Sequence, residues 1–272
     1  MSDDQDPTLY ELLAVAVART MRNDDVGFTG LTTGDAAAMF GTMIPLAAMQ
    51  LARETHAPDL TVLLGGWCVN PSLHMLATLP NAEFDPVLLQ LECDARDMSY
   101  PPLYTFRRGD VTVGFSSGAQ VDRAGNLNTT TVSASRGKLR LVGPILIPEH
   151  LGLFGREIIM MPRNDRLRFV ESVHHRTGVG FPDGRSGRAA LGLRGGGPEL
   201  VVTPLGIFGF DDEGLAELIA TVPGVRPEDV VDATGFDFRY APIKALQAPP
   251  TRDELRILRE SVDPFGHLRR SI

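Results

Sequence analysis

Hydrophobic and polar residues alternate along the first 66 residues in a pattern that predicts helix, strand, helix and strand. A capping box that starts at Thr8 precedes an apolar-rich run, which predicts a helix over 12–21. The run 59–66 is continuously apolar and ends in two glycines, which is typical of a central parallel strand covered on both faces. Between them, the pattern predicts a strand over 26–30 and a helix over 45–55.

This order of elements is a βαβ unit, and it predicts an open, mostly parallel, doubly wound α/β sheet. Short segments rich in apolar or β-branched residues predict the later strands, which are 110–115, 157–161, 169–173, 199–203 and, as the last of the series, 206–210. The Gly- and Arg-rich stretch 178–197 predicts a long loop over the sheet. A second capping box at Thr251 predicts a terminal helix that Asp263-Pro264 ends. We find no internal repeat or boundary, so we expect a single domain over 1–272.

The composition is that of an ordinary globular protein. Of 272 residues, 43% are hydrophobic and 22% are charged, which excludes a disordered or fibrous chain. Lys+Arg 26 against Asp+Glu 34 gives a net charge of −8, and without a basic stripe we expect no nucleic-acid partner. The two cysteines, the acidic start and the lack of a long apolar segment predict a cytoplasmic protein that does not contact a membrane.

The string from Gly118 to Asn128, directly after a predicted strand, has two interpretations. Asp122 to Gly125 has the residues of a β-turn, with Asp first and Gly last. Alternatively, the string is a ligand site, because glycine at a strand end lets a ligand approach the backbone. The residues of such a site would be Gly118, Ala119, Gln120, Asn126 and Asn128.

Glycines also end the two predicted strands of the βαβ unit. Gly30 follows the first strand, and Gly65 and Gly66 follow the second. Open α/β sheets bind ligands at the carboxyl ends of their strands, so these glycines predict a crevice. A steric explanation stays open, since glycine also allows a tight exit from a strand.

Few side chains in the sequence have the arrangement of a catalytic or metal site. Glu149 and His150 are adjacent and form a weak acid–base candidate, which loop polarity explains equally well. The neighbours His174 and His175 lack the helical spacing of metal ligands, and we predict no metal site. There is no P-loop, GxSxG elbow or GxGxxG turn.

Several longer strings resemble the β subunits of class I coenzyme A transferases, and glutaconate CoA-transferase most closely. The likeness runs from about Tyr10 to Pro264. The segments on which the resemblance rests are Gly118–Thr129, Glu157–Met161, Arg166–Phe169, Leu191–Leu193, Gly197–Thr203, Gly206–Phe210, Pro227–Val230, Thr234–Asp237 and Asp263-Pro264. The resemblance implies the CoA-transferase fold, an α subunit of related fold as partner, and coenzyme A as part of the substrate, with no permanently bound cofactor.

One position departs from the family pattern. In the transferases a glutamate ends the strand that corresponds here to 61–66, and its carboxylate attacks the acyl-CoA thioester. Aligned through Gly66, that position is Leu64, which has no nucleophile. The glycine-rich CoA loop of the transferases also corresponds to a bulkier stretch here, from Gly143 to His150.

These features leave three hypotheses for the function. First, the chain is the β subunit of an enzyme that hydrolyses a carbon–carbon bond of a cyclic β-keto acyl-CoA, as related heteromers of steroid catabolism do without the glutamate. Second, it is a CoA-transferase that moves CoA between carboxylic acids and takes its nucleophile from elsewhere. Third, it is a non-catalytic binding or regulatory subunit on the same fold.

Overall fold

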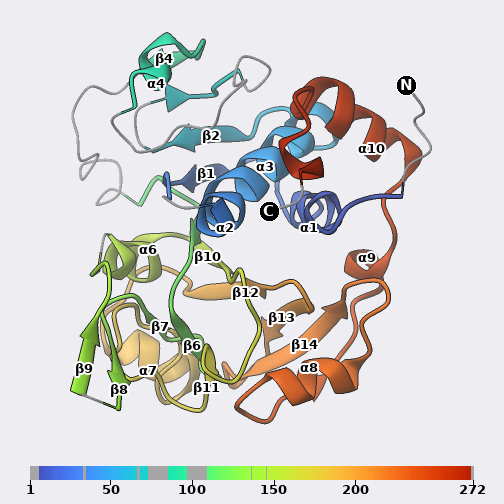
Figure 1. The fold of residues 1–272 in the computed structure, drawn as a ribbon. Helices are drawn as coiled ribbons and strands as arrows, with labels where there is room; N and C mark the ends of the chain where they lie inside the picture. The colour runs from blue at the N-terminus through green and yellow to red at the C-terminus, as the bar shows by residue number, and fades with distance from the viewer. Residues whose placement is uncertain are drawn as a thin grey trace. The chain divides into compact units, whose positions relative to one another are not determined.

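The structure is a computed structural model that describes residues 6–32, 35–65, 68–72, 85–96, 109–135, 137–144 and 146–270. The chain forms two compact units (Figure 1). Unit 1 comprises Met1–Tyr104 and Ala248–Ile272, and unit 2 comprises Thr105–Gln247. Within the described ranges, we find no helix long and apolar enough to cross a membrane.

Unit 1 is built on the predicted βαβ unit. Strand β1 (Val26–Thr29) pairs in parallel with β2 (Thr61–Leu64), and helix α3 (Ile44–Thr55) connects them and packs on both. The strand order is β1-β2-β3-β4, and the last two strands pair antiparallel. The other elements are α1 (Leu9–Ala18), α2 (Asp35–Ala38), the π-helix η1 (Met39–Met43), β3 (Cys68–Val69), α4 (Val87–Gln90), β4 (Ala95–Arg96), α10 (Arg252–Ile257), the π-helix η3 (Leu258–Val262) and the 3₁₀ helix η4 (His267–Arg269).

Both predicted capping boxes of unit 1 are confirmed. Thr8 and Thr251 accept hydrogen bonds from the backbone N–H of Glu11 and Glu254, respectively, and the two glutamates bond back. The second box opens α10, which continues into η3 and ends before Asp263 as predicted. Within unit 1, helix α3 contacts both α1 and α10 (Figure 1).

In unit 2, the strands of the large sheet follow the order β15-β14-β13-β12-β10-β5. Strands β5, β10 and β12 pair in parallel, while β13 pairs antiparallel with both neighbours. A smaller sheet has the order β11-β6-β7, and β8 and β9 form a separate hairpin (Figure 1). The strands are β5 (Val113–Ser116), β6 (Gln120–Asp122), β7 (Leu127–Asn128), β8 (Thr131–Ala134), β9 (Gly137–Arg140), β10 (Arg156–Met160), β11 (Phe169–Val170), β12 (Pro198–Val202), β13 (Gly206–Phe210), β14 (Ala216–Thr221) and β15 (Arg239–Tyr240).

The helices of unit 2 are α6 (Ile147–Leu153), α7 (Gly184–Ala190), α8 (Pro227–Ala233) and α9 (Lys244–Gln247). Helix α6 packs on β5 and β10. An apolar core lies beneath α6 and α8 and includes the rings of Phe169 and Phe208, which are tilted by 32° with centroids 5.7 Å apart. Parallel strands with packed helices in both units confirm the α/β fold class.

Two sequence predictions for unit 2 are wrong. The strand at 206–210 is not the last, because β14 returns along it after a tight turn that Asp211 and Gly214 close. The stretch 178–197 is not wholly a loop, because it contains α7. This helix is anchored by buried Arg188, whose guanidinium donates to carbonyls of Leu151, Val179 and Gly195, rather than by an apolar face. A search for apolar periodicity therefore misses it.

Candidate functional site

In unit 1, the structure brings two of the predicted site glycines to neighbouring strand ends. Thr29 is the register partner of Leu64, and the backbone N–H of Gly65 donates to the carbonyl of Thr29 over 2.8 Å. Gly65 has φ +59°, a conformation that glycine adopts without strain. Gly30 follows Thr29 directly, and Gly66 lies outside the described residues. The predicted pairing of the two strand ends is confirmed.

The side chain at the expected nucleophile position is fully buried. Leu64 has 0% exposure, and its register partner in β3 is Cys68. Burial and the neighbouring Cys93 thiol raise the pKa of Cys68 to about 11, so its thiol is protonated near neutral pH. A protonated, buried thiol is a poor nucleophile. Neither Leu64 nor Cys68 can therefore replace the transferase glutamate.

Three threonines, which the sequence patterns did not single out, fix the chain that follows β1. Thr29 Oγ1 donates to the carbonyl of Gly41 over 2.8 Å, and Thr42 Oγ1 donates to the carbonyl of Gly30 over 3.0 Å. Thr32 Oγ1 in turn donates to the carbonyl of Ala37. These bonds hold the π-helix η1 against the strand end, and π-helical turns occur often at functional sites. The sequence feature that could have pointed to these threonines is the Thr/Gly/Ala-rich composition of 31–43.

In unit 2, the predicted site residues after β5 form one hydrogen-bonded group. The backbone N–H of Ala119 donates to the carbonyl of Asn128 over 2.8 Å. Asn128 Nδ2 donates to Gln120 Oε1 over 2.9 Å, and both side chains are buried. A Cβ at Gly118 would lie 2.6 Å from Leu127 Cδ1, so the hairpin packs closely on this glycine. The structure brings Gly118, Ala119, Gln120 and Asn128 together.

The β-turn from Asp122 to Gly125 is confirmed, because the N–H of Gly125 donates to the carbonyl of Asp122 over 2.9 Å. Burial raises the pKa of Asp122, although hydrogen bonds from Asn126, Val173 and Ala124 act in the opposite direction. Asn126 Nδ2 donates to both Asp122 oxygens, and Asn126 Oδ1 accepts from the N–H of Gly180. The Asn126 amide thus joins the turn to the chain before α7.

His174 is a further member of this group, and the sequence pattern had raised it only as a possible metal ligand. Its Nδ1 accepts a hydrogen bond from the backbone N–H of Ser133 over 3.0 Å and lies 3.3 Å from Gln120 Nε2. Because the Ser133 N–H can only donate, the proton of the neutral imidazole is on Nε2. His174 is exposed and connects β8 to Gln120. Among the described residues, no group of three or more His, Cys, Asp or Glu side chains could hold a metal ion.

The weak acid–base candidates, Glu149 and His150, have different surroundings. Glu149 is half-buried in the first turn of α6. His150 is buried, and its Nδ1 lies 3.1 Å from Oε1 of Glu157, which has 0% exposure. Leu146, just before α6, has the left-handed φ of +61° that is uncommon for leucine. Within the bulky stretch that precedes His150, Leu146 therefore has a backbone conformation typical of glycine.

No family model matches the chain. Curated relatives, however, match it over nearly its whole length. The B subunit of 3-oxoadipate CoA-transferase from Pseudomonas knackmussii is 32% identical over 252 residues, or 92% of this chain and 91% of the relative. The B subunit of glutaconate CoA-transferase from Acidaminococcus fermentans is 28% identical over 97% of this chain and 96% of the relative. The IpdB subunit of the cholesterol ring-cleaving hydrolase from Mycobacterium tuberculosis is 34% identical, but over 35% of this chain and 38% of that subunit.

Solved structures agree with these relatives. Glutaconate CoA-transferase from Acidaminococcus fermentans has a TM-score of 0.76 at 26% identity and covers 97% of this chain and 98% of the matched chain. The decarboxylase AibA/AibB, with a TM-score of 0.75 at 24% identity, covers 97% of this chain and 98% of the matched chain, and shows the fold alone. The resemblance inferred from the sequence is therefore confirmed, and the chain belongs to the family of CoA-transferase B subunits.

Proposed function

We propose that this chain is the β subunit of a heteromeric enzyme that hydrolyses a carbon–carbon bond of a β-keto acyl-CoA. The observation that carries the proposal is the fully buried Leu64 at the end of β2. A transferase of this family forms a covalent intermediate, which requires a nucleophile that Leu64 lacks. Hydrolysis of a β-keto acyl-CoA needs only a base to activate water and donors for the developing enolate.

The hydroxyl and thiol groups near this strand end support the same proposal. Thr29 Oγ1 is committed to the carbonyl of Gly41, and the Cys68 thiol is buried with a raised pKa. Within the part of unit 1 that the structure describes, the ends of β1 and β2 therefore offer no activated nucleophile. We infer that the base for water comes from the partner, an α subunit of related fold, and that no cofactor is bound permanently.

We further propose one acyl-CoA-binding segment in each unit: the strand ends at Gly30, Gly65 and Gly66 in unit 1, and the backbone at Gly118 and Ala119 in unit 2. The buried amides of Gln120, Asn126 and Asn128 hydrogen-bond within the protein, so in this proposal they shape the site instead of donating to the ligand. His174 Nδ1 accepts a hydrogen bond within this group, so the donor of the neutral imidazole is its Nε2–H. It is a candidate donor to an enolate oxygen.

A CoA-transferase is the second candidate, because the relatives matched over more than nine-tenths of the chain carry that name. This candidate requires the nucleophile to come from the α subunit or from Glu149. Trapping with borohydride distinguishes the two candidates, since only the transferase passes through an enzyme–CoA thioester.

The direct test uses the chain co-produced with its α subunit and a cyclic β-keto acyl-CoA, with CoA species followed by mass spectrometry. The proposal predicts a product heavier by one water, with CoA still attached, both with and without acetate or succinate. Acetyl-CoA or succinyl-CoA that forms only with an acceptor would establish the transferase instead. Unchanged substrate would favour a non-catalytic subunit.

A further inference from the structure

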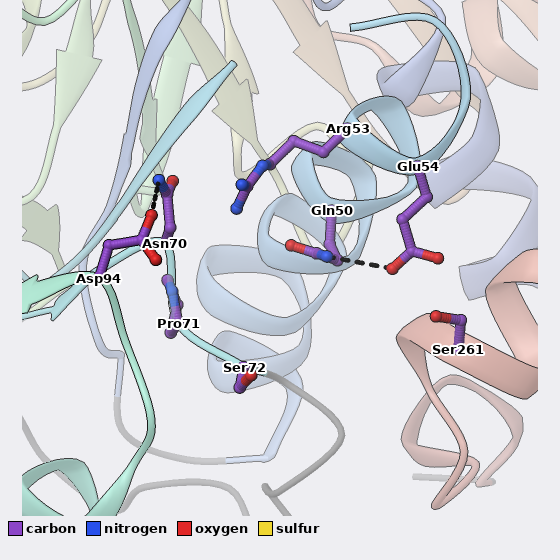
Figure 2. A pocket seen from close by; sticks show the side chains of 8 residues that line it. All are labelled: Gln50, Arg53, Glu54, Asn70, Pro71, Ser72, Asp94 and Ser261. Carbon is purple, nitrogen blue, oxygen red and sulfur yellow. Dashed lines mark hydrogen bonds between the residues drawn. The ribbon is translucent and has the colours of Figure 1, made fainter. Parts of the chain in front are cut away.

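A polar pocket of about 280 Å³ lies in unit 1, away from the strand ends described above (Figure 2). The pocket lies at the amino-terminal end of β2, because Asn70 in its wall exchanges hydrogen bonds with Val62. Gly65, in contrast, follows the carboxyl end of this strand. Ligand pockets for larger molecules measure about 300–1,000 Å³, so this volume suits a metabolite the size of an amino acid. The pocket is independent of the proposed acyl-CoA site.

One wall is the last turn of α3, which presents Gln50, Arg53 and Glu54. These residues are three and four positions apart, so they share one face of the helix. Gln50 Nε2 donates to Glu54 Oε1 over 3.0 Å and holds that carboxylate beside the pocket. The half-buried Arg53 guanidinium makes no ion pair with any carboxylate in the part of the chain that the structure describes.

The opposite wall is held by hydrogen bonds and carries the second carboxylate, that of Asp94. Asn70 has φ +50°, and its Oδ1 accepts from the N–H of Val62 while its Nδ2 donates to Asp94 Oδ2 over 2.7 Å. The N–H of Ser72 is bonded to the carbonyl of Glu92. Figure 2 shows the Arg53 side chain extending toward the wall of Asn70 and Asp94, with Glu54 and Ser261 on the other side.

In this pocket, the Arg53 guanidinium lies between the carboxylates of Asp94 and Glu54 (Figure 2). None of these three groups has a charged partner among the residues that the structure describes. A ligand with one carboxylate and two ammonium groups would complement every charge: its carboxylate on Arg53 and its ammonium groups on Asp94 and Glu54. Charge-assisted hydrogen bonds of this kind are stronger than neutral ones. We propose that this pocket binds a diamino carboxylic acid of the size of lysine or ornithine.

The test titrates L-lysine into the full chain assembled with its α subunit, by isothermal calorimetry. We expect one lysine per chain. Loss of one charge-assisted contact lowers affinity by about tenfold to a hundredfold. Cadaverine, which lacks the carboxylate, and L-norleucine, which lacks the second ammonium group, should therefore bind at least about tenfold more weakly.

Variants assign the binding to the pocket. Arg53→Gln should weaken lysine binding by about tenfold or more, and Arg53→Lys should retain part of it. The matched control is Arg252→Gln, which changes an exposed arginine of the same unit outside the pocket and should bind lysine as the wild type does. Thermal unfolding within about 2 °C of the wild type verifies that each variant is folded. No saturable heat, equal binding of cadaverine, or an unchanged affinity in Arg53→Gln would overturn the proposal.

Discussion

His150 Nδ1 lies 3.1 Å from Glu157 Oε1, and both side chains are buried in unit 2. The second carboxylate oxygen, Glu157 Oε2, has no hydrogen-bond partner among the described residues. A Cβ at Gly114 would overlap this oxygen and the Phe154 ring, which explains the glycine in β5. The pair therefore joins α6 to β10 inside the protein, a structural role for the histidine that the sequence offered as a weak acid–base candidate.

We predict that Glu157→Ala lowers the free energy of unfolding by about 3–5 kcal/mol. The substitution removes the buried partner of the His150 imidazole and leaves a cavity where the carboxylate was. Glu157→Gln should cost less, since an amide of the same shape still bonds the imidazole. Urea unfolding measures both values. If Glu157→Ala unfolds like the wild type while the assembled enzyme loses activity, the pair is catalytic and our assignment is wrong.

A second prediction concerns the left-handed backbone at Leu146, φ +61°, before α6. A non-glycine residue there costs roughly 1–2 kcal/mol, which glycine does not incur. Leu146→Gly should therefore be more stable than Leu146→Ala by about 1 kcal/mol, although both remove the leucine side chain. Thermal melts of the two variants, compared with each other, measure the backbone effect alone. Equal stability would mean that residue 146 is not left-handed in solution.

Asp122 provides a prediction about acid pH. Burial raises its pKa above the ordinary 3.8, so the folded state binds the proton more tightly than the unfolded state. As the pH rises from 3.8 through the folded pKa, the unfolded state loses its proton first, and the free energy of unfolding falls. Asp122→Asn cannot titrate, so the advantage of the wild type over this variant should shrink across that window. Urea titrations at a series of pH values test the sign, and an advantage that grows with pH would contradict it.

The Arg19–Glu254 ion pair predicts the opposite pH dependence in unit 1. Burial would raise the pKa of Glu254, but hydrogen bonds from Arg19 and Thr251 outweigh it and lower the pKa below the ordinary 4.5. Its contribution is therefore present above pH 4.5 and is lost as the pH falls through the folded pKa. Glu254→Gln should destabilise the protein by about 1 kcal/mol at neutral pH and by less in acid. Arg252→Gln, which changes an exposed arginine at the start of the same helix, is the control and should show little change.

Much of the fold could be predicted from the sequence, because the first βαβ unit and both capping boxes depend on local patterns. Helix α7 could not, since Arg188 and backbone carbonyls hold it instead of an apolar face. Strand β14 was missed because its burial does not alternate cleanly. Both errors arise where tertiary contacts, and not local periodicity, determine the structure.

The candidate site was predictable only as positions along the chain. Glycine at strand ends pointed to Gly30 and Gly65, and the structure places them side by side as expected. The sequence could not show that Gln120 and Asn128 bond to each other, nor that His174 reaches Gln120 from 54 positions away. Such pairings depend on the meeting of β6, β7 and the chain after β11.

The π-helix η1 gives this region a sensitivity to chain length. An α-helix turns about 100° per residue, and the wider turn of η1 accommodates one residue more than an α-helical turn would. Deleting a single residue from 39–43 would therefore let an ordinary α-helical turn replace η1, and Asp35–Ala38 would keep its orientation relative to α3. The hydrogen bonds made from within the turn, such as the one from Thr42 to the carbonyl of Gly30, are the contacts that such a deletion would alter. In evolution, the loss of one residue here would be absorbed within a single helical turn over the strand end, with no change in the fold beneath it.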